Sequence, residues 1–147
     1  RDPFYSNLFY YENLYPTEKS IIWRIYVLLY FAEKALTIKG HYLELGCYRR
    51  TNTESLLKRC DLNKYKKKYY LYDIFEWEDG SEYPELPEHK NSKMYAKVVK
   101  RFSRHKNVNV VSGYVPDSFE KAFPDEIAFA HMDMNQATVE AKALDLI

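Results

Sequence analysis

From residue 41 onward, the chain alternates between short apolar runs and longer segments whose apolar residues recur at three- and four-residue steps. The short runs indicate strands, and the longer segments indicate helices. This alternation is typical of a parallel sheet with helices on its faces and predicts an α/β fold. The expected strands are residues 41–47, 68–73, 107–111 and a run that begins at Ile127; the expected helices are residues 51–60, one from about Asn91, 117–123 and 138–147.

Another helix is expected before the first strand, from near Pro16 to about Thr37, with Gly40 ending it. The first twenty residues mix aromatic and polar groups without a clean period, so we expect an arm or loop there. Residues 75–90 contain two prolines and a glycine, which predicts a surface loop. The length of 147 residues fits one domain, residues 21–147, preceded by the aromatic arm, residues 1–20.

Polar side chains follow the last apolar run, which has the sequence IAFAHMDMN. In an open α/β sheet, ligands bind at the carboxyl ends of the strands, so Asp133 is placed to meet a divalent metal or a positively charged cofactor. Asn135 could add an amide oxygen, but these two side chains alone do not complete a metal site. His131 lies two residues before Asp133 and could be a base, although a histidine in an apolar run is more often a core residue.

The other strand ends carry further candidates. Gly46 after the first strand would let the backbone pass close to a ligand, and Glu44 should accept hydrogen bonds from nearby backbone or a bound cation. Asp73 could bind both hydroxyls of a ribose or could cap the turn that follows it. Ser112 and Gly113 form a turn after the third strand and could meet an adenine. The turn at Gly46 has one glycine and no GxGxxG, which disfavours an NAD- or FAD-binding site.

Composition and charge disfavour several kinds of partner and site. The net charge of +1 gives no argument for nucleic acid or a membrane surface as a partner, and the lysine-rich residues 64–68 are expected to form a solvated loop. Cys47 and Cys60 are the only cysteines, so we expect neither a disulfide framework nor a zinc site, and a reducing cytoplasm fits best. The 15 tyrosines could mark a ligand cleft, a subunit interface or ordinary packing.

Taken together, four segments resemble the macrocin O-methyltransferase-like family of class I methyltransferases. Members of that family show an acid-x-Gly turn, then Asp-x-Phe-Glu, Gly-x-Val-Pro-Asp and His-x-Asp-x-Asn or Asp. The matching segments here, in the same order over about residues 41–147, are LELGCYRRTNTESLL, KKYYLYDIFEW, VKRFSRHKNVNVVSGYVPDSF and IAFAHMDMNQATVEAKALDLI. The resemblance implies a Rossmann-like fold and the use of S-adenosylmethionine.

By position, the resemblance assigns roles to individual residues. The turn that contains Glu44, Gly46, Cys47 and Tyr48 would line the methionine end of the cofactor. Asp73 would bind its ribose, and Ser112 and Gly113 would lie near its adenine. Asp133 would be the first ligand of a magnesium ion that activates the hydroxyl of a small-molecule acceptor, such as a sugar or another natural product, with His131 beside it.

Two departures from the family leave alternatives open. Arg50 stands where relatives usually have glycine, which favours a non-catalytic binding or assembly module of the same fold as the second hypothesis. Relatives also continue with a strand that bears two more metal-binding carboxylates, whereas this sequence ends at Ile147, after four expected strands of seven. We therefore expect a fragment truncated after the fourth strand. The arm could close over the acceptor or pack against a second subunit, so a homodimer remains open.

Overall fold

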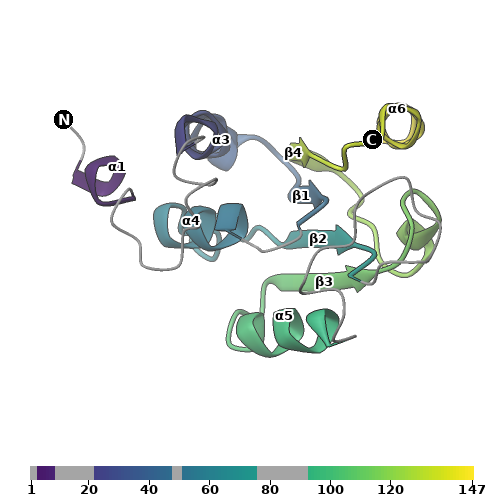
Figure 1. Cartoon of the computed structure of the whole chain (residues 1–147). Coiled ribbons are helices and arrows are strands. Elements are labelled where there is room, and N and C mark those ends of the chain that lie inside the picture. The colour runs from purple at the N-terminus through teal and green to yellow at the C-terminus, as the bar shows by residue number, and fades with distance from the viewer. Residues whose placement is uncertain (1–2, 9–21, 48–50, 76–92) are drawn as a thin grey trace.

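The computed structural model describes residues 3–8, 22–47, 51–75 and 93–147. At its centre is a sheet of four parallel strands in the order β3-β2-β1-β4 (Figure 1). This arrangement confirms the predicted α/β fold with a parallel sheet. The strands are β1 (His41–Leu45), β2 (Tyr69–Asp73), β3 (Val108–Ser112) and β4 (Ile127–Met132).

Helices cover both faces of the sheet, as the sequence predicted, and most of their ends agree with the expected ones within a few residues. The predicted helix start near Pro16 lies outside the described residues, and the described part of that helix begins at Ile22. The predicted helix at residues 117–123 is a shorter 3-10 turn, and β4 is half-buried because β1 is its only partner among the described strands. The helical elements are α1 (Pro3–Leu8), α3 (Ile22–Lys34), η1 (Ala35–Thr37), α4 (Thr51–Arg59), α5 (Met94–Phe102), η3 (Asp117–Glu120) and α6 (Ala137–Leu144).

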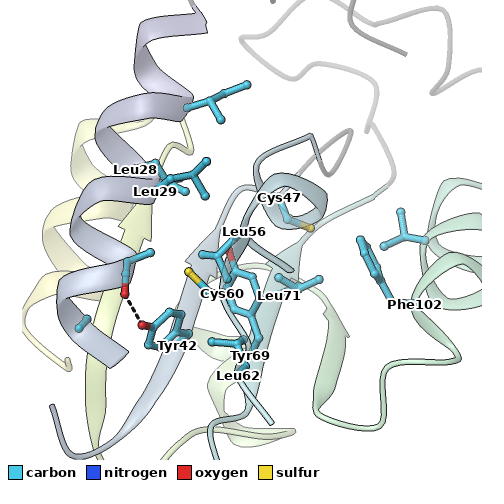
Figure 2. Close-up of a cluster of buried hydrophobic side chains, with 14 of the residues drawn as sticks. Leu28, Leu29, Tyr42, Cys47, Leu56, Cys60, Leu62, Tyr69, Leu71 and Phe102 are labelled. Atoms are coloured by element: carbon cyan, nitrogen blue, oxygen red, sulfur yellow. Dashed lines mark hydrogen bonds between the residues drawn. The ribbon is translucent and has the colours of Figure 1, made fainter. Parts of the chain in front are cut away.

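Alternation along the strands divides the buried side chains between two cores. On β1, Tyr42 faces the larger cluster, which also contains the buried residues of α3, α4 and α5 (Figure 2). Leu43 and Leu45 face the smaller cluster, which contains Ala143 of α6 and is packed by Phe119 of η3. Each inner strand is therefore buried on both sides, which explains why β1 and β2 are almost continuously apolar in the sequence.

Three tyrosines are among the largest fully buried side chains. Tyr42, Tyr69 and Tyr72 have no solvent-exposed area. The Tyr42 hydroxyl donates to the carbonyl of Ala32, and the Tyr72 hydroxyl donates to the carbonyl of Ala122. Their burial is possible because each hydroxyl has an acceptor. Of the three explanations for the tyrosine content, ordinary packing therefore accounts for these residues.

Two segments contain features that the sequence did not predict. Within the predicted arm, α1 is a helix, because Pro3 suits the first helical position and Phe4 packs against the larger core under the guanidinium of Arg59. Within the predicted solvated loop, Lys67 is buried and its ammonium group donates to the carbonyls of Ile38 (2.5 Å) and Gly40 (2.9 Å). Ile38 follows η1 and Gly40 precedes β1, so Lys67 holds the connection between these two elements.

Residues 9–20 of the predicted arm and residues 76–90 of the predicted loop lie outside the described part of the chain. Among the described helices, none combines the length and the apolar character needed to cross a membrane.

Candidate functional site

The candidate residues gather where the four parallel strands end. The amide of Gly46 donates to the Tyr72 carbonyl (2.9 Å), and the amide of Gly113 donates to the Asp73 carbonyl (3.0 Å). The amide of Asp133 donates to the Leu45 carbonyl (2.9 Å). These three bonds hold the ends of β1, β2, β3 and β4 at one side of the sheet, which we call the carboxyl edge.

Gly46 has a structural reason to be glycine besides the predicted approach to a ligand. Its φ of +85° lies in the left-handed region, and a Cβ added there would lie 2.3 Å from the Asp133 carbonyl oxygen. The close approach that Gly46 permits is therefore between the chain segments that follow β1 and β4. Without a side chain at this position, Asp133 can lie directly beside the turn at Gly46.

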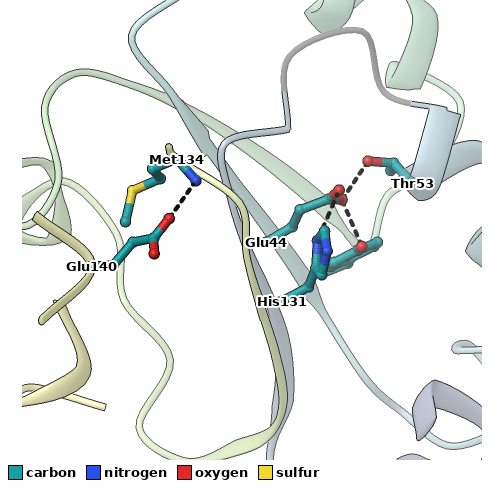
Figure 3. A network of polar contacts seen from close by, with 6 residues as sticks. Glu44, Thr53, His131, Met134 and Glu140 are labelled. Carbon is teal, nitrogen blue, oxygen red and sulfur yellow. Dashed lines mark hydrogen bonds and ion pairs between the residues drawn. The ribbon is translucent and has the colours of Figure 1, made fainter. Parts of the chain in front are cut away.

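Glu44 is the most deeply buried acidic group at this edge, with no exposed area. Its Oε2 accepts hydrogen bonds from Thr53 Oγ1 of α4 and from the Tyr69 hydroxyl of β2, each at 2.6 Å (Figure 3). The sequence predicted backbone donors or a cation, whereas the observed donors are two hydroxyl groups. Burial, together with the neighbouring Glu44 carboxylate, raises the pKa of Tyr69 well above its ordinary value, so Tyr69 remains a donor.

The second oxygen of Glu44 faces His131. The β1–β4 register places the two residues opposite each other, and Glu44 Oε1 lies 3.7 Å from His131 Nδ1 (Figure 3). Neither atom has a hydrogen-bond partner among the described residues, although both are buried. A buried carboxylate oxygen without a donor is costly, so these two atoms are suited to a protonated ligand group that can donate to both.

Asp73 performs the turn-capping role that the sequence left open. Its Oδ1 accepts a hydrogen bond from the Phe75 amide at 2.9 Å, and Phe75 has a φ of +57°. The buried Phe75 ring anchors this turn in the larger core. The carboxylate is thereby held at the end of β2, at the carboxyl edge, where a ribose could also reach it.

Ser112 and Gly113 lie beside a residue that the sequence analysis missed. Lys121 follows η3, and its ammonium group donates to the Ser112 carbonyl at 2.6 Å. A Cβ on Gly113, whose φ is +138°, would lie 3.2 Å from the same nitrogen. Lys121 therefore places a positive charge against this turn, and no motif in the sequence indicated that contact.

Asp133 lies just beyond β4 and is exposed. The next amide, that of Met134, donates to Glu140 Oε1 of α6 at 2.9 Å (Figure 3). Asn135 then turns the chain with a φ of +57°. Glu140 thus fixes the segment that carries Asp133, a role that the sequence did not predict because it depends on a contact with the Met134 backbone.

The predicted site also included Cys47 and Tyr48. Cys47 is buried, and its amide approaches the Tyr72 carbonyl at 3.3 Å. Tyr48 and Arg50 lie outside the described part of the chain. Within the described residues, no group of three or more His, Cys, Asp or Glu side chains could hold a metal ion.

Comparison with known proteins supports the fold but does not assign the chain to a family. No protein-family model matches the sequence, and no curated protein matches it. The structure is similar to a solved structure described as that of the O-methyltransferase NovP, with a TM-score of 0.62 and 18% sequence identity. The similarity covers 84% of this chain and 58% of that chain, so this chain spans little more than half its length. The chain therefore has a Rossmann-like fold of the kind found in that methyltransferase.

Proposed function

We propose that this chain forms the cofactor-binding part of an S-adenosylmethionine-dependent O-methyltransferase that acts on a hydroxyl group of a small molecule. Support comes from the fold shared with an O-methyltransferase and from the candidate residues at the carboxyl edge of the sheet. The single observation that carries the proposal is the buried Glu44 Oε1, which lacks a hydrogen-bond donor and faces His131 Nδ1.

These two atoms fit the methionine end of the cofactor. Glu44 Oε1 and His131 Nδ1 can each accept a hydrogen bond, and a ligand ammonium group offers several donors. Thr53 and Tyr69 hold the carboxylate in place before a ligand binds. The negative charge of Glu44 would also favour a cationic ligand at this edge. When bound, S-adenosylmethionine supplies an activated methyl group that a hydroxyl oxygen can attack.

The other end of the cofactor would lie along the ends of β2 and β3. Asp73 would accept hydrogen bonds from the ribose, because its carboxylate is already oriented by the Phe75 amide. Ser112 and Gly113 would lie beside the adenine. Asp133, exposed at the same edge, would accept a hydrogen bond from the acceptor hydroxyl. His131 would contact the methionine end of the cofactor beside Glu44.

A magnesium ion at this edge has less support than the cofactor. The described residues offer Asp133 at this position but no group of three ligating side chains. The donors present therefore do not make a metal site by themselves, and we assign no step to a metal. A magnesium ion stays a prediction of the family resemblance.

We expect S-adenosylhomocysteine to bind with a Kd of about 10 μM in isothermal titration calorimetry, or about 7 kcal/mol. Asp73→Asn should weaken that binding by about 10- to 100-fold, because the ribose loses hydrogen bonds to a charged acceptor. Asparagine keeps an oxygen for the Phe75 amide, so the melting temperature should change little. Absence of binding to the unmodified chain would refute the proposed function.

The same titration tests the non-catalytic alternative. A degenerate site blocked by Arg50 would bind the cofactor product only after Arg50→Gly. Binding by the unmodified chain would exclude that alternative.

A further inference from the structure

Although the net charge of the chain is only +1, two adjacent segments carry large charges of opposite sign. Residues 93–106 contain four lysines, two arginines and no acidic residue, a net charge of +6. Residues 76–92 contain six acidic residues and one lysine, a net charge of −5. The rest of the chain is neutral overall, so nearly all of its charge asymmetry is concentrated around α5.

The packing of α5 fixes where its positive charges face. Met94, Val98 and Phe102 are buried in the larger core, so the helix cannot rotate without losing that packing. Lys97 and Lys100 are exposed on α5, and the exposed Lys93 and Arg104 flank its two ends, so four cations recur at steps of four, three and four residues. We call these four residues the basic stripe: Lys93, Lys97, Lys100 and Arg104.

The basic stripe is not neutralised by the described part of the protein. Arg101, next to it, forms an ion pair with Glu54 of α4. No ion pair joins any of the four stripe residues to a described carboxylate. A cleft of about 520 Å³ is lined by Arg101 together with Lys97, Lys100 and Arg104. The stripe is therefore a concentrated positive surface that would favour association with an anionic partner.

The spacing of the cations identifies the kind of partner. Lys97 and Lys100 are separated by a rise of about 4.5 Å along α5, and carboxylates three residues apart on a second α-helix have the same separation. Phosphates on one strand of a nucleic acid duplex recur at about 3.4 Å. The stripe also has no aromatic member on which bases could stack. We propose that the basic stripe docks an acidic α-helix of a partner protein, independently of the proposed catalytic function.

A designed peptide tests this proposal. The probe is a fluorescent helical peptide with glutamates at alternating steps of four and three on one face, measured by anisotropy at about 50 mM salt. The comparison peptide has the same composition with the glutamates distributed around the helix. We expect the one-faced peptide to bind several-fold more tightly. Replacing all four stripe residues by glutamine should weaken its binding about tenfold or more, since each exposed charge pair contributes roughly a factor of two to five.

A matched variant removes the same amount of charge elsewhere and should keep the affinity for the one-faced peptide. Equal binding of the two peptides, or equal losses in the stripe and matched variants, would overturn the proposal. Tighter, stripe-dependent binding of a 20-nucleotide duplex would overturn it in favour of nucleic acid. If the peptide bound only after the acidic residues of 76–92 were neutralised, the stripe would belong to the chain's own acidic segment. The matched variant replaces four exposed lysines by glutamine: Lys34, Lys64, Lys68 and Lys142.

Discussion

Gly46→Ala is expected to lower the free energy of unfolding by about 3 kcal/mol or more. An alanine at a φ of +85° costs about 1–3 kcal/mol in backbone strain. Its Cβ would also lie 2.3 Å from the Asp133 carbonyl oxygen, so one of two hydrogen-bonded chain segments must move. Overpacking of this kind typically costs a further 1–3 kcal/mol. Urea denaturation followed by circular dichroism measures the change.

Gly113→Ala is the matched control for this prediction. Gly113 also has a positive φ, but the nearest atoms to its added Cβ belong to the side chains of Lys121 and Ser118, and the lysine can move. Gly113→Ala should therefore cost clearly less than Gly46→Ala. If the two variants lost the same stability, the contact between Gly46 and Asp133 would not be the reason for glycine at that position.

Above about pH 10, the free energy of unfolding is expected to fall by about 4 kcal/mol per pH unit. Burial raises the pKa of Tyr42, Tyr69 and Tyr72 above the ordinary value of 10.0. A group whose folded pKa is raised contributes stability below its unfolded pKa and loses it as the pH rises. Each of the three hydroxyls then releases a proton only on unfolding, which contributes about 1.4 kcal/mol per pH unit.

Two other groups modify this slope in known directions. Burial raises the pKa of Cys60 to about 11 from 9.0, so loss of stability begins near pH 9. Burial lowers the pKa of Lys67 from 10.5, which opposes the loss below that pH because the unfolded state binds more protons. The slope due to the three tyrosines is therefore best measured by urea denaturation above about pH 11, where Cys60 no longer contributes.

Tyr42→Phe should reduce this slope by about one third, because one of the three buried hydroxyls is removed. Tyr30→Phe is the matched control, since the Tyr30 ring is 47% exposed, and it should leave the slope unchanged. A slope for the unmodified protein no steeper than one group's share would contradict the assignment of these tyrosines to the core.

The sequence predicted the fold well because its main signals are local. Alternating apolar runs and amphipathic segments located all four strands and the helices between them, with small differences at their ends. The errors arose where distant contacts overrode local pattern. Phe4 makes α1 part of the core by packing near Arg59, and Lys67 is buried because it donates to carbonyls 29 and 27 residues away.

The candidate site was predicted in position but not in detail. Polar residues at strand ends were sufficient to place Glu44, Asp73 and Asp133 at one edge of a parallel sheet. Their partners could not be found in this way, because Tyr69 is 25 residues from Glu44 and each contact depends on strand order. The roles of Lys121 and Glu140 were not predicted for the same reason, because each side chain forms a hydrogen bond with the backbone of another segment.

Amide chemical-shift mapping with S-adenosylhomocysteine tests most directly whether the carboxyl edge of the sheet binds the cofactor. We expect saturable shifts concentrated at Gly46, Asp73, Gly113 and Asp133. Absence of shifts would contradict this expectation. Shifts confined to the cleft of about 540 Å³ at the opposite ends of the strands, lined by residues that include Lys39 and His41, would contradict it equally.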